Sequence, residues 1–152
     1  MIQRKQTLFL LLTVVVSLVC IWLPVGVYVP QSLNVDSTMY NMWILKGDGN
    51  TDFSAFPLII LQFAGMLISI FTIFMYNKRK LQIKLCNFGM IVYIIWYAAY
   101  ALLITQDLLG DNVKFQVSFA AVLPLVCIVL LFMARKGVKD DEALLRAAER
   151  LR

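Results

Sequence analysis

The three cysteines are the most reactive side chains in this sequence, and their spacing decides whether they can do thiol chemistry. They are Cys20, Cys86 and Cys127, so no two of them form a C-x-x-C pair. A disulfide oxidoreductase needs closely spaced cysteine pairs, and each of these cysteines lies inside or beside an apolar block instead. We therefore expect three reduced thiols that pack as small apolar side chains.

A second candidate for chemistry is the acidic stretch "DGNTDF", in which Asp48, Asn50 and Asp52 copy the first three ligand positions of a calcium loop. The match then fails, because Phe53 stands where the loop needs glycine and the twelfth position, Ile59, is already in an apolar block. We expect an ordinary Gly/Asn/Asp turn there, about which the flanking residues could form a hairpin, and no metal.

Histidine is absent from the whole chain, which removes the commonest general base and the commonest ligand of zinc and haem. A membrane enzyme with an acidic outer site is the alternative, but the spacing of the outer acids matches no known catalytic or metal pattern. These acids are Asp36, Asp48, Asp52, Asp107 and Asp111. The sequence therefore predicts a protein that is not an enzyme, with no catalytic residues, no cofactor and no metal.

Aromatic residues recur every three or four positions from Tyr93 to Tyr100, so they share one face of a helix. A quinone or another aromatic ligand could stack there, but packing within a helix bundle is the commoner use of such a row. The sequence "GMLIS" is a small-xxx-small pattern that lets two helix backbones approach closely. The candidate helix-packing residues are Gly65, Ser69, Tyr93, Trp96, Tyr97 and Tyr100.

These residues must be positioned by elements suited to lipid, since 61% of the 152 residues are hydrophobic and the mean hydropathy is +0.80. The apolar residues gather in four blocks, each long enough to cross a bilayer. We predict an all-α fold, a four-helix transmembrane bundle over residues 1–137, in which Pro124 kinks or loosens the last span. Its spans are 8–29, 56–75, 85–105 and 115–133, joined by an outer loop (30–55) and an inner loop (76–84).

The positions of the basic residues predict the orientation of the chain. Twelve of the fourteen lie before the first span, between the second and third, or after the fourth. The positive-inside rule then predicts that both termini lie in the cytoplasm. The net charge of +5 would otherwise suggest nucleic acid, which we do not expect as a partner. The candidate contacts with the inner leaflet of the lipid bilayer are Lys78, Arg79, Lys80 and Lys84.

No acidic or basic residue lies well inside a span, which argues against a proton-coupled pump and leaves open a passive pore lined by neutral groups. The neutral polar residues in or beside the spans could form a hydrogen-bonded solute path. We favour the alternative that they bond between helices. They are Ser17, Gln62, Ser69, Thr72 and Ser118.

The last residues, 138–152, predict a short amphipathic cytoplasmic helix, which Asp140 or Asp141 can cap. So short a helix is marginal in water unless the inner leaflet, the inner loop or another protein covers its apolar stripe. The stripe is partly alanine, so lipid alone should bind it weakly and we favour protein docking. The candidate docking residues are Leu144, Ala147, Ala148 and Leu151 on one face, and Arg146 and Arg150 on the other.

Three stretches, "MIQRKQTLFLLL", "KLQIKLCNF" and "KDDEALLRAAERLR", resemble a family of small four-helix inner-membrane proteins of the Bacteroidota that is known only as a domain of unknown function. The resemblance implies a membrane protein with no assigned activity. Our leading hypothesis is an accessory or scaffold subunit of an inner-membrane complex, docked to other membrane protein subunits. The alternative is a homo-oligomeric transporter or channel for a small solute.

Overall fold

The computed structural model of the chain describes residues 3–30, 35–75, 78–108 and 113–150. Long helices and very short strands make up most of these ranges. The helices are α1 (Gln3–Trp22), α2 (Phe56–Phe74), α3 (Arg79–Leu108) and α4 (Leu123–Arg150), with short 3-10 helices at Phe53–Ala55 and Phe119–Val122. The strands are β1 (Gly26–Pro30), β2 (Ser37–Met39), β3 (Ile44–Leu45), β4 (Thr51–Asp52) and β5 (Val113–Val117).

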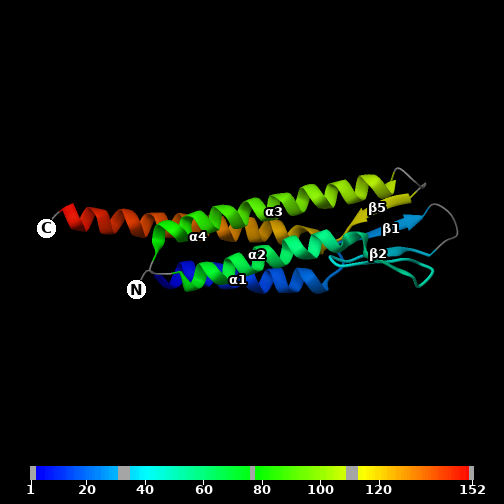
Figure 1. The fold of residues 1–152 in the computed structure, drawn as a ribbon, viewed down its shortest axis with the longest axis horizontal. Helices are drawn as coiled ribbons and strands as arrows, with labels where there is room; N and C mark the ends of the chain where they lie inside the picture. The colour runs from blue at the N-terminus through cyan, green and yellow to red at the C-terminus, as the bar shows by residue number, and fades with distance from the viewer. Residues whose placement is uncertain (1–2, 31–34, 76–77, 109–112, 151–152) are drawn as a thin grey trace.

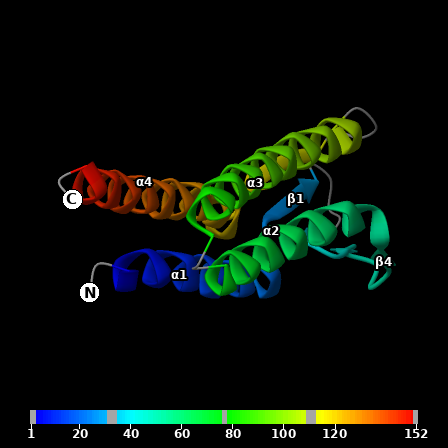
Figure 2. The ribbon, with the colours of Figure 1, turned by 60° about the vertical axis from the view of Figure 1, so that its left-hand side comes forward.

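The four long helices of the described chain form an elongated bundle. Helix α1 packs against α2 and α4, and α3 packs against the same two helices from the other side. Both ends of the chain, the end of α2 and the start of α3 lie at one end of the bundle, and the strands lie at the other (Figure 1). The turned view shows the same separation of the sheet from the two ends of the chain (Figure 2). We call these the terminal end and the sheet end.

Three of these helices are long and apolar enough to cross a membrane, over Phe53–Phe74, Arg79–Gln106 and Phe119–Leu144. They correspond to the predicted second, third and fourth spans and indicate a membrane protein. The apolar part of α1, Gln6–Trp22, is shorter. The predicted first span, 8–29, was too long, because the chain leaves the helix after Trp22 and enters strand β1 at Gly26.

The prediction of an all-α fold is confirmed only in part: the described chain is mostly helical with four long helices, but the strands form one antiparallel sheet in the order β4-β3-β2-β1-β5. Strand β5 pairs with β1 over its full length, from Gly26 opposite Val117 to Pro30 opposite Val113. The predicted fourth span, 115–133, therefore began too early. The expected hairpin is present as β3 and β4, and its turn contains Gly49, whose φ of +79° suits glycine.

The sheet is joined to the bundle by a buried apolar cluster at the sheet end. The ring of Trp96 stacks on that of Tyr100, with the centroids 5.1 Å apart, and Tyr100 contacts Phe115 of β5. A Cβ on Gly26 would lie 2.1 Å from the Cζ atom of Phe115, so only glycine fits beneath that ring. The cluster ties α3 to both strands of the β1–β5 pair.

Two helices are longer than a bilayer needs, and they extend in opposite directions. Helix α3 has 30 residues and α4 has 28, about 45 Å and about 42 Å at the usual rise, against an apolar layer of about 30 Å. The extra length of α3 runs beside the sheet, whereas α4 projects past its neighbours at the terminal end (Figure 1).

Two expectations for this last part of the chain are corrected. Residues 138–150 are not a separate short helix but the uninterrupted continuation of α4. Pro124 does not kink a span, because it is the second residue of α4, where the missing N–H breaks no helical hydrogen bond.

The contact between α2 and α3 at Gly65 provides the first test. A Cβ there would lie 2.6 Å from Cζ of Tyr93, so Gly65→Ala should force the helices apart and destabilise the fold by about 1–3 kcal/mol. The measurement is the thermal midpoint of the purified protein in detergent. Gly89→Ala is the matched control, because its nearest neighbour, at 3.1 Å, is a methyl group of Leu131 that can move. Equal midpoints for the two variants would contradict this account.

Candidate functional site

The terminal end of the bundle is held by contacts that converge on Asp141 of α4. The side-chain amide of Gln6 in α1 donates a hydrogen bond to the Asp141 carboxylate. Arg79 of α3 donates from Nη1 to the Asp141 backbone oxygen at 3.4 Å. Gly137 lets Gln6 approach, since a Cβ there would lie 3.0 Å from Gln6 Cγ. Asp141 is therefore not the helix cap that we expected but a buried link between α4 and two other helices.

Beyond Asp141 the described side chains of α4 are largely uncovered. Leu144 is 60% exposed and Ala147 is also exposed. On the opposite side, Arg146 donates to Glu142 at 2.6 Å, one helical turn away. Two of the predicted docking side chains, Ala148 and Arg150, lie outside the described side chains, and Leu151 lies outside the described residues. The described part of the apolar stripe, at Leu144 and Ala147, is therefore exposed.

The four basic residues that we predicted at the inner leaflet divide into two kinds. Lys78, Lys80 and Lys84 are exposed at the start of α3 or just before it. Arg79 is half-buried and bonds to α4 as described above. Three of the four are thus free to face a charged surface, and the fourth joins helices.

The aromatic row of α3 faces into the bundle and the junction with the sheet. Tyr93 and Trp96 are fully buried, and the Tyr100 hydroxyl donates to the Val25 backbone oxygen at 2.8 Å. The Tyr97 hydroxyl donates to the Ala121 oxygen at 2.7 Å and accepts from the Leu125 N–H at 3.0 Å, at the start of α4. Because these hydroxyls bond to the backbone of other elements, the row joins parts of the fold.

The centre of the bundle holds the other predicted packing residues. The Tyr93 hydroxyl lies 2.6 Å from Ser17 Oγ of α1, and Ser17 Oγ lies 3.5 Å from Cys127 Sγ of α4. Gly65 of α2 lies against the Tyr93 ring. Ser69 is buried and donates to the Gly65 backbone oxygen at 2.9 Å, within its own helix.

Asn41 is a buried polar residue that sequence reasoning missed. Its Nδ2 donates to the Cys20 backbone oxygen at the end of α1 at 2.7 Å. Its Oδ1 accepts from Trp96 Nε1 at 3.2 Å. The side chain is fully buried, so this residue of the outer loop locks the sheet onto α1 and α3. Its position within the apolar run "MYNMWIL" was the signal available in the sequence.

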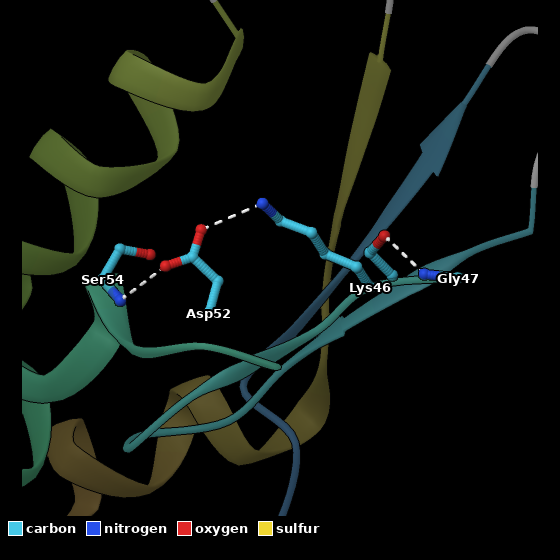
Figure 3. A network of polar contacts seen from close by, with 5 residues as sticks. Lys46, Gly47, Asp52 and Ser54 are labelled. Carbon is cyan, nitrogen blue, oxygen red and sulfur yellow. Dashed lines mark hydrogen bonds and ion pairs between the residues drawn. The ribbon is translucent and has the colours of Figure 1, made fainter. Parts of the chain in front are cut away.

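The stretch that imitates a calcium loop forms an ion pair in this structure. Lys46 Nζ lies 3.0 Å from Asp52 Oδ2, and the Ser54 backbone N–H donates to Asp52 Oδ1 at 3.1 Å (Figure 3). The bond from Lys46, and then that from Ser54, lower the pKa of Asp52. Within the described ranges, no group of three or more His, Cys, Asp or Glu side chains is arranged to hold a metal ion.

The comparison with protein families matches almost the whole chain. Residues 2–151 fit the model of a domain of unknown function, DUF4293. The chain belongs to the DUF4293 family. The resemblance to a domain of unknown function is thereby confirmed, whereas the bacterial phylum stays a prediction. The comparison with curated proteins finds no match to this DUF4293 chain.

The Asn41 junction gives the second test. Asn41→Ala should leave the Trp96 N–H and the Cys20 oxygen buried without these partners and lower the stability by about 1–3 kcal/mol per orphaned group. Asn50→Ala, at an exposed position of the same loop, should change the thermal midpoint little. A midpoint for Asn41→Ala equal to that of Asn50→Ala would show that the buried amide does not hold the sheet to the bundle.

Proposed function

We propose that this DUF4293 protein is a non-catalytic integral protein of the inner membrane of a bacterium of the Bacteroidota. In this proposal both termini lie in the cytoplasm, and the protein is an accessory or scaffold subunit that docks other membrane protein subunits through the projecting end of α4. The observation that carries the proposal is the uncovered apolar stripe at Leu144 and Ala147, on a helix anchored at Asp141.

The direction of α4 favours a protein partner over lipid for this stripe. A helix that binds a membrane surface lies in the plane of the interface. Here the final turns continue along the axis of α4 and leave the bundle at its terminal end (Figure 1). Because α4 itself crosses the apolar layer in this proposal, its continuation leads away from the membrane surface. A second protein surface is then the available cover for Leu144 and Ala147.

The depth of the bundle in the bilayer follows from its exposed aromatic residues. At the sheet end, Trp22 is 81% exposed and Phe119 is 79% exposed, each at the junction of a helix with the strands. Of these two residues it is tryptophan, with its amphipathic ring, that favours the boundary between lipid and water. Helix α2, with 19 residues and about 28 Å of length, then fits the apolar layer between this boundary and the terminal end. With both termini in the cytoplasm, as proposed, the sheet would then lie on the outer side.

The orientation is tested by labelling introduced cysteines from one side of the membrane, in the wild-type background because the three native thiols are buried. We expect Asp48→Cys to react with an impermeant maleimide in intact spheroplasts. Lys80→Cys and Lys139→Cys should react only after permeabilisation, because the positive-inside rule places the terminal end in the cytoplasm. Opposite behaviour of the last two variants would contradict the topology.

The docking role is tested without disturbing Asp141. The double variant Leu144→Glu/Ala147→Glu places two charges on the stripe and should remove the partner subunits that co-purify from gently solubilised membranes, at least tenfold by quantitative mass spectrometry. The expected reason is that charges buried in an apolar contact without partners cost more than the contact supplies.

Lys139→Glu is the matched control for this experiment. It changes the net charge by the same amount, and position 139 lies on the opposite side of α4 from position 144 at about 100° per residue. It should leave co-purification unchanged. The scaffold proposal fails if the stripe variant retains every partner, or if both variants lose the same partners equally.

A further inference from the structure

Gln62 of α2 is the one neutral polar residue of the described spans whose side chain is both fully buried and unpartnered within the described residues. Neither its Nε2 nor its Oε1 has a hydrogen-bond partner there. Ser17, Ser69 and Thr72, also in the bundle, each have one. Buried amides in folded proteins bond to protein or to ordered water, so Gln62 requires an occupant from outside the chain.

The four long helices each contribute a buried side chain that can form hydrogen bonds: Ser17 from α1, Gln62 from α2, Tyr93 from α3 and Cys127 from α4. The first, third and fourth are already linked by the contacts of 2.6 Å and 3.5 Å described above. The Gln62 amide is the member that this network leaves unlinked.

The geometry at Gly65 brings Gln62 near this network. A Cβ on Gly65 would lie 2.9 Å from the Tyr93 hydroxyl oxygen, so that hydroxyl sits directly over α2. Gln62 precedes Gly65 by three residues on the same buried face, and side chains at this spacing begin about 5–6 Å apart. A single small molecule can therefore span the gap between the Gln62 amide and the hydroxyls of Ser17 and Tyr93.

The hydrogen-bond donors and acceptors of the site indicate which kind of molecule can bind there. The amide offers two donors and an acceptor, and the hydroxyls can act as either, so the occupant must both donate and accept hydrogen bonds. An ion is disfavoured because α2, which carries Gln62, contains no charged residue to balance it. On the side toward the sheet, Asn41, Trp96 and Cys20 are fully buried and bonded to one another, so no large molecule can enter from there.

We propose that an ordered water molecule occupies the centre of the bundle, bonded to the Gln62 amide and to the Ser17–Tyr93 pair. Water reaches it along α2 from the terminal end, where Thr72 and Gln82 continue the buried polar face. The Thr72 hydroxyl donates to the Ile68 oxygen at 2.6 Å, and Gln82 Nε2 donates to the Thr72 backbone oxygen at 3.5 Å. Both side chains are buried, and a hydroxyl oxygen and a primary amide can each form a further hydrogen bond to water.

The direct experiment is water-edited solid-state NMR on the full chain in lipid vesicles, with ¹⁵N-labelled glutamine and tryptophan. Magnetisation from water should reach the side-chain amide of Gln62 nearly as fast as it reaches the side-chain amide of Gln116, which is exposed. It should arrive at least threefold faster than at Trp96 Nε1, which is buried and bonded to Asn41. The Gln62 resonance is assigned as the side-chain amide signal that is absent from the spectrum of the Gln62→Met variant. Transfer to Gln62 as slow as transfer to Trp96 would overturn the proposal.

A stability measurement separates a hydrated site from a dry one by an independent route. If water forms hydrogen bonds with the amide, Gln62→Met removes the main group that binds this water. The thermal midpoint should then fall or stay unchanged. If the amide is buried dry, replacing it with an apolar side chain of similar size should raise the midpoint, and the proposal fails. This inference concerns the bundle core alone, so its failure would leave the scaffold proposal standing.

Discussion

Helices inside a bilayer gain little from burying apolar side chains against one another, because lipid is equally apolar, so this bundle depends on close backbone approach and on buried polar contacts. Both occur at the centre, where Gly65 admits the Tyr93 ring and the Tyr93 hydroxyl meets Ser17. The same combination recurs at the terminal end, where Gly137 admits Gln6 and Gln6 bonds to Asp141. Small residues and polar partners thus fix the spacing of the helices where hydrophobic burial cannot.

In the proposed placement, the unequal lengths of the helices divide the molecule into one zone in lipid and two zones in water, one on each side of the membrane. The overhang of α3 enters the water layer together with the strands, and Tyr100 packs there against Phe115 of β5. The overhang of α4 enters the opposite water layer without a helix beside its last described turns, so Leu144 stays exposed. A chain of this size therefore presents a covered, sheet-bound surface on one side of the membrane and an uncovered helix on the other.

Hydropathy predicted α2 and α3 well, because long apolar runs have few other structures open to them in lipid. It failed at the ends of α1 and α4 nearest the sheet, because apolar residues in 25–29 and 115–117 extend the apolar runs of the helices beside them. What distinguishes them is the pairing of β1 with β5, which joins residues about ninety positions apart that no local pattern connects. The spacing of the α3 aromatics indicated a shared face, but the role of Asn41 depended on that same long-range closure of the sheet.

The buried polar contacts also connect the sheet end, the centre and the terminal end of the bundle through one helix. Asn41 ties the sheet to α1 and α3, Ser17 and Tyr93 tie the same two helices at the centre, and Gln6 and Asp141 tie α1 to α4 at the terminal end. Helix α1 takes part in every one of these links. Because it is also the helix with the shortest apolar segment, we expect its position in the bundle to depend more on these polar partners than on its apolar length. Through the link at Asp141, α1 therefore helps to determine where the free end of α4 points, and with it the surface that a partner would meet.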